Sequence, residues 1–126
     1  MNLFKTLFDG KSGDAPSDTL TVAIARAKDV LRLDEDDLAD GGLKKREDIV
    51  GVLNNLQAAK AALRTGVDME GRRISPREIG IGLSLMLADM RAHGSWFRLH
   101  VNASDKARRA LDALKEAVEV SAKSMI

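Results

Sequence analysis

The chain has 126 residues with 20 basic and 19 acidic side chains, and 31% of its residues are charged. This length favours one domain with its own hydrophobic core, and the absence of cysteine excludes disulfides and thiolate metal sites. With a net charge of +1, the chain lacks the strong excess of basic residues that is typical of dedicated nucleic-acid-binding domains. The first residues contain no long apolar run of the kind found in signal peptides, so we expect a cytoplasmic protein.

Residues 1–8 carry apolar side chains at helical spacing, namely Leu3, Phe4, Leu7 and Phe8. The polar, glycine-containing segment that follows is typical of a flexible linker. We therefore divide the chain into an N-terminal arm with its linker, residues 1–16, and a helical-bundle domain, residues 17–126. Such an arm can fold back onto its own domain, dock into a groove of another chain or rest on a membrane surface. The sequence leaves these three alternatives open.

Apolar residues at helical spacing predict four main helices, at about residues 18–33, 43–65, 76–92 and 104–124. We expect them to pack as a single, compact all-α bundle. Ser17 or Asp18 is predicted to cap the first helix, and Asn102 or Ser104 the last. Residues 34–42 contain five acidic side chains, whose spacing fits the first turn of a short helix better than a calcium loop.

The third predicted helix has a clear start signal, because Ser75, Pro76 and Glu78 can form a capping box. Apolar side chains then surround the helix on nearly all sides, so we expect it to be the most buried of the four. Glycine in a helix costs about 1 kcal/mol relative to alanine. Gly80 and Gly82 therefore predict close packing, with the alanine-rich face within residues 58–62 as the candidate neighbour. The preceding residues 66–74 fit a small hairpin or an irregular loop equally well.

The sequence contains no pattern of catalytic, cofactor-binding or metal-binding residues. His93 and His100 do not have the spacing with which one helical face presents two metal ligands. A nucleophilic cysteine is absent, and Ser95 lies in no nucleophile-elbow pattern. We therefore expect no cofactor and no metal, and a non-enzymatic protein, with a small enzyme as the less favoured alternative.

A second candidate interaction segment is formed by Trp96, Phe97 and Arg98, after the third helix. Residues 96–101 alternate in polarity, which fits a short strand, a lid over the bundle or a partner-contacting surface, since Trp and Arg are favoured binding anchors. Together with the N-terminal arm, this segment predicts a protein–protein interaction or assembly protein. The expected partner is a protein, as in a homo-oligomer or larger assembly. Phage-type particles offer an analogy of architecture alone.

Nucleic-acid binding is the alternative function. Between residues 64 and 109 there are nine basic and five acidic side chains, and arginine side chains bind phosphates well. The candidate residues are Arg64, Arg72, Arg73, Arg77, Arg108 and Arg109. The separate basic run Lys44, Lys45 and Arg46 is predicted to be no more than a solvated helix face.

Overall fold

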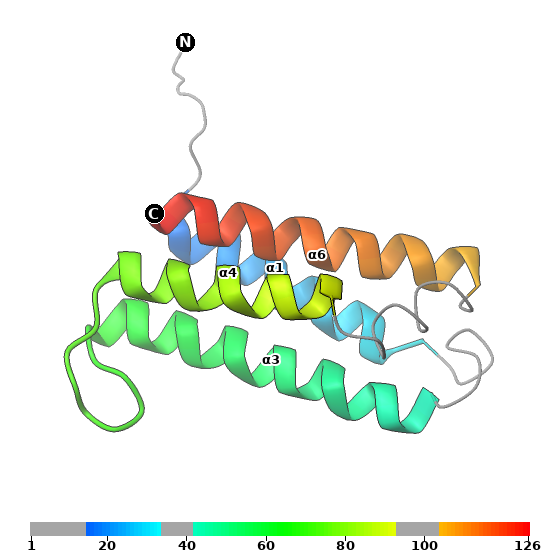
Figure 1. The fold of residues 1–126 in the computed structure, drawn as a ribbon, viewed down its shortest axis with the longest axis horizontal. Helices are drawn as coiled ribbons and strands as arrows, with labels where there is room; N and C mark the ends of the chain where they lie inside the picture. Colours follow the sequence, from blue (N-terminus) through cyan, green and yellow to red (C-terminus); the bar gives the residue numbers. More distant parts are fainter. Residues whose placement is uncertain (1–14, 34–41, 93–103) are drawn as a thin grey trace, which may run out of the picture.

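The structure, a computed structural model, describes residues 15–33, 42–92 and 104–126. These residues form four α-helices (Figure 1): α1 Pro16–Leu31, α3 Gly42–Thr65, α4 Pro76–Ala92 and α6 Asp105–Met125. The predicted all-α bundle is confirmed, and each helix boundary lies within two residues of the predicted one. The acidic segment predicted as a short helix lies outside the described residues, apart from its last glycine.

The four helices pack as a ring rather than around a central helix (Figure 1). Helix α6 packs against both α1 and α4, and α1 also packs against α3, whereas α3 and α4 contact each other sparsely. Side chains from all four helices meet inside the ring, with Leu20, Leu56, Met90 and Leu111 almost fully buried. Helices α1 and α4 lie across the ring from each other, and the interface between α3 and α4 is the open one.

The expectation that the third predicted helix is the most buried is wrong. Helix α4 buries five of its 17 residues, whereas α6 buries eight of its 21. On the outer face of α4, Ile81 remains 44% exposed and Leu85 68% exposed. Both lie on the side of α4 opposite the buried Ile79, Leu83 and Leu87 and therefore face away from the interior of the bundle.

The two helical glycines of α4 have different surroundings. A Cβ atom added to Gly80 would lie 2.9 Å from the backbone oxygen of Ala122 and 2.9 Å from Cγ1 of Ile126. Close packing is therefore confirmed at Gly80, but the neighbour is α6 and not the alanine-rich face of α3. Gly82 has nothing within 4 Å of such an atom, so the expectation of close packing is wrong there.

Helix ends explain where the chain turns. Ser75 and Glu78 form the predicted capping box, since the Glu78 amide donates to Ser75 Oγ and the Ser75 amide donates to Glu78 Oε1. Ser104 caps α6 by accepting from the Ala107 amide. The predicted cap of α1 is wrong: α1 begins at Pro16 after Ala15, which makes no side-chain cap. Proline suits this first position because its missing N–H would have no helical partner.

The prediction that the basic run at the start of α3 is no more than a solvated face is wrong for Arg46. Its guanidinium donates hydrogen bonds to the backbone oxygens of Leu31 and Leu33, at the end of α1. These carbonyls have no intrahelical partner, and a cation there also complements the helix dipole. Arg46 thus connects the end of α1 to the start of α3.

None of the helices in the described ranges is long and apolar enough to cross a lipid bilayer.

Candidate interaction groove

An apolar groove runs along the open interface between α3 and α4. Its floor is made by Ala59 and Ala62 of α3 and by Ile79 and Leu83 of α4, all of which belong to the buried core. Gly82 lies at the edge of the groove and has no side chain to fill it. The cavity has a volume of about 270 Å³. We call this feature the α3–α4 groove.

Both ends of the α3–α4 groove are bounded by described residues. Partway along the helices, Asn55 Nδ2 of α3 lies 3.6 Å from the sulfur atom of Met86 of α4, which bridges the groove. At the other end the groove meets the connection between the helices, where Met69 and Ile74 line it. Met69 is 90% exposed, so an apolar and adaptable side chain stands beside the groove without cover.

The connection between α3 and α4 is a tight hairpin, which decides between the two interpretations of residues 66–74. Val67 and Arg73 form an antiparallel bridge, and the Ile74 amide donates to the Gly66 oxygen at 3.1 Å. Gly66 and Gly71 have φ angles of 77° and 81°, in the left-handed region that other residues adopt at a cost. The hairpin therefore has a defined shape that holds Asp68 and Met69 beside the groove.

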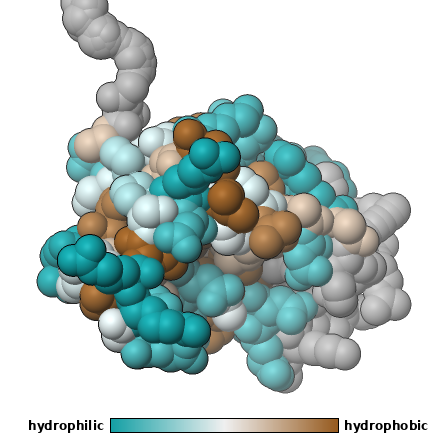
Figure 2. Space-filling model, turned by 60° about the vertical axis from the view of Figure 1, so that its left-hand side comes forward, coloured by the Kyte–Doolittle hydropathy of each residue, from teal (hydrophilic) through white to brown (hydrophobic). Residues whose placement is uncertain are grey.

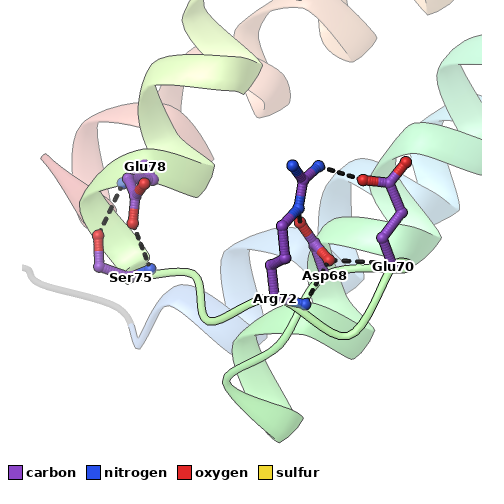
Figure 3. A network of polar contacts seen from close by, with 5 residues as sticks. All are labelled: Asp68, Glu70, Arg72, Ser75 and Glu78. Atoms are coloured by element: carbon purple, nitrogen blue, oxygen red, sulfur yellow. Dashed lines mark hydrogen bonds and ion pairs between the residues drawn. The ribbon is translucent and has the colours of Figure 1, made fainter.

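Two carboxylates lie at the hairpin end of the groove (Figure 3). Asp68 Oδ1 accepts hydrogen bonds of 2.9 Å from the amides of Glu70 and Arg72, and Arg72 Nε lies 3.5 Å from Asp68 Oδ2. The Arg72 side chain also pairs with Glu70. The hydrogen bond from the Arg72 amide is the main cause that lowers the pKa of Asp68 below its ordinary value.

Glu78 is held in its charged form in a similar way. The amide of Ser75 donates to its carboxylate at 2.9 Å, and this hydrogen bond lowers the pKa of Glu78. Both carboxylates are therefore ionised at neutral pH. Two carboxylates thus line the hairpin end of an otherwise apolar groove, and Asp68 is paired there with Arg72.

The size and lining of the groove limit what it can hold. Its volume of about 270 Å³ lies just below the roughly 300–1,000 Å³ of small-molecule pockets. It exceeds the roughly 150 Å³ of an apolar cavity that takes up a benzene molecule. An apolar groove of this size suits one or two large apolar side chains.

Comparisons with family models, with curated proteins and with solved structures found no match. Within the described ranges, no group of three His, Cys, Asp or Glu side chains could hold a metal ion.

Other hydrophobic residues reach the surface near the groove. Leu85 lies on α4 three residues after Gly82 and therefore on an adjoining part of the helix surface. In the space-filling view, brown patches of hydrophobic residues are separated by teal hydrophilic ones (Figure 2). A second hollow, between α1 and α6, has a volume of about 330 Å³, but Arg26 and Glu116 place charges in its lining.

The structure brings only some of the predicted site residues together. The apolar residues of the arm and the second segment lie outside the described residues: Leu3, Phe4, Leu7, Phe8, Trp96, Phe97 and Arg98. The candidate phosphate-binding arginines divide between opposite ends of the bundle (Figure 1). Arg64, Arg72, Arg73 and Arg77 lie in or beside the hairpin, whereas Arg108 and Arg109 lie at the start of α6. Arg72 pairs with two carboxylates and Arg108 with Asp105, so the six arginines form no single patch.

Sequence reasoning did not find the α3–α4 groove. The available signal was the run of small residues on both helices, Ala58, Ala59 and Ala62 on one and Gly82 on the other. Small residues allow two helices to approach closely, but they also leave a hollow wherever the helices stand apart. The sequence does not distinguish these outcomes, because the helix–helix distance is set by α1 and α6.

Proposed function

We propose that this protein is a non-enzymatic assembly protein that associates with other protein chains through its N-terminal arm, residues 1–8. The observation that carries the proposal is the α3–α4 groove, an apolar surface on the described bundle with room for large side chains. Amphipathic segments that place apolar anchors in such grooves are a recurring mode of protein recognition. Phe4 and Phe8 supply anchors of that kind, and their spacing of four residues is the one with which a helix presents two side chains on the same face.

The arm suits recognition for a second reason. Five of its eight residues are large and apolar, and a polar segment separates it from α1. A large apolar side chain that is fully buried contributes roughly 1.5–3 kcal/mol. The one or two side chains that the groove accommodates therefore offset part of the cost of association.

Solution mass tests the proposal. We expect light scattering on a sizing column to give the full chain a mass of at least twice 13.7 kDa. The variant Phe4→Ser/Phe8→Ser should elute as a monomer with unchanged helical content and melting temperature. Val50→Ser is the matched control, because Val50 is an apolar residue on α3 that is already 42% exposed.

Two results contradict the proposal. One is a wild-type chain that is monomeric at every concentration measured. The other is a double variant that keeps the wild-type mass but melts at a lower temperature, which would place the arm in the protein's own core.

Nucleic-acid binding is a second candidate because Arg64, Arg73 and Arg77 are exposed around one end of the bundle. It predicts binding to DNA or RNA that weakens steeply with salt. Arg73→Ala/Arg77→Ala should then reduce the affinity at low salt. No binding to either nucleic acid in low-salt buffer, measured by fluorescence anisotropy, argues against this function.

A further inference from the structure

We propose that the α3–α4 groove of one copy of this protein receives the N-terminal arm of a second copy. This inference rests on the proposed function, since it names the surface to which the arm binds. It adds that the partner is the protein itself and that each chain carries both halves of the contact.

The groove is a surface that the described chain leaves uncovered. Ala58 and Gly82 are too small to fill the space between α3 and α4, and Gly82 has nothing within 4 Å of a built Cβ atom. Leu85 is 68% exposed beside it, and Met69 is 90% exposed at its hairpin end. An apolar occupant would cover surface that otherwise contacts water, which is favourable at about 25 cal/mol per Å².

The arm matches the groove in size. Taken as a helix, as its spacing predicts, an eight-residue segment is about 12 Å long and presents Phe4 and Phe8 on one side. An apolar cavity of about 150 Å³ accepts a benzene ring, so a groove of about 270 Å³ accommodates at least one phenylalanine ring. Met69 and Met86 line the groove, and methionine sulfur makes favourable contacts with aromatic rings.

The arm and the lining of the groove also carry charges of opposite sign. Asp68 and Glu78 are ionised carboxylates at the hairpin end of the groove. The only charged side chain among residues 1–8 is Lys5, which lies between Phe4 and Phe8. A bound arm therefore brings one positive charge to a groove lined by two carboxylates, of which Asp68 is already paired with Arg72, and it brings no carboxylate.

The length of the linker favours the groove of another copy over the chain's own groove. Helix α1 begins at Pro16 and lies across the ring from α4. Two helix–helix spacings of about 8–10 Å each separate them, so an arm would travel about 16–20 Å before reaching the outer side of the groove. Residues 9–15 span at most about 24 Å when fully extended, and about 15 Å on average as a glycine-rich coil. Binding in the same chain would extend the linker beyond its average coil length, whereas a neighbouring copy can place its groove within that length.

The test uses full-length chains that each lack one half of the contact. The donor variant is Phe4→Ser/Phe8→Ser. The acceptor variant is Gly82→Leu, which fills the groove and replaces glycine within a helix by a better helix former. Gly51→Leu is the matched control, because Gly51 also lies within a helix, has nothing within 4 Å of a built Cβ atom and does not line the groove.

We expect the donor and acceptor variants to be monomers by light scattering, and Gly51→Leu to keep the wild-type mass. An equimolar mixture of the two monomeric variants should form dimers, since it contains one intact arm and one intact groove. Circular dichroism should show that every variant keeps its helical content.

A Gly82→Leu chain that assembles like the wild type overturns this inference, while the proposed function stands if the donor variant is monomeric. A mixture that remains monomeric at concentrations where the wild type is fully assembled also overturns it. A monomeric wild-type chain overturns both the inference and the proposed function.

Discussion

Ser121 of α6 is completely buried, and its hydroxyl has no hydrogen-bond partner among the described residues. A buried polar group without a partner loses its hydration and gains nothing in return, which costs about 1–3 kcal/mol. The hydroxyl of the nearby Ser124, in contrast, has hydrogen-bond partners. The Ser124 hydroxyl donates to the Ser121 backbone oxygen at 2.7 Å and lies 3.3 Å from the Thr19 hydroxyl of α1.

We expect Ser121→Ala to raise the free energy of unfolding by about 1 kcal/mol, because it removes the unsatisfied hydroxyl and leaves only a small void. Ser124→Ala should lower it by about 0.5–1.5 kcal/mol, since this change breaks hydrogen bonds that exist. Urea unfolding followed by circular dichroism measures both values. A loss of stability in Ser121→Ala would show that its hydroxyl has a partner in solution.

The helices were predictable from the sequence because the signals that define them are local. Ser75, Glu78 and Gly66 end or begin helices through contacts a few residues away. The relative burial of the helices was not predictable, since it depends on which helices become neighbours. The same limit applies to Arg46, whose hydrogen-bond acceptors lie on α1. Charge and spacing alone do not show an acceptor more than ten residues away.

The glycines of the helices give a prediction at this scale. Gly80→Ala should lower the melting temperature, because its Cβ atom would lie 2.9 Å from the Ala122 backbone oxygen and force α4 away from α6. Gly82→Ala and Gly51→Ala should each raise the free energy of unfolding by about 1 kcal/mol, since both sites have open space and alanine favours the helix. Thermal melting of the three variants tests the distinction. Equal effects at Gly80 and Gly82 would contradict the close approach of α4 to α6.

The capping box of α4 gives a prediction for acid. The pKa of Glu78 is lower in the folded protein than its ordinary value. Its charge therefore stabilises the fold at neutral pH, and this contribution is lost as the pH falls through the folded-state pKa. Glu78→Gln keeps an acceptor oxygen but cannot titrate, so the wild-type melting temperature should fall more than that of the variant between about pH 6 and pH 3. Parallel melting curves across this range would contradict the prediction.

At the scale of the whole molecule, the ring has one open interface. Helices α1 and α6 each have a well-packed neighbour on both sides, whereas α3 and α4 each have one close neighbour. We expect amide hydrogens in the middle of α1 and α6 to exchange most slowly, because they require opening of the whole bundle. Hydrogen–deuterium exchange with mass spectrometry measures this order. Slowest exchange in α4 would contradict it.

Only the arm of the candidate site was predicted from the sequence, by the apolar spacing of Phe4 and Phe8. It lies outside the described residues and stays a prediction. The groove that we propose as its acceptor depends on α3 and α4 being held apart by contacts with α1 and α6. Such an arrangement follows from four helices packing at once. It has no signature in either helix that lines the groove.

The pairing of α1 with α6 has a consequence for how the chain folds as it is made. Thr19 and Ser124 lie in contact across this interface although 105 positions separate them in the sequence. A ribosome that has released α1, α3 and α4 has not yet released the helix against which α1 and α4 pack. Until then the nascent helices expose apolar faces that α6 covers in the folded bundle. The bundle can close only when α6 emerges, so the nascent chain gains its protection against aggregation from that helix.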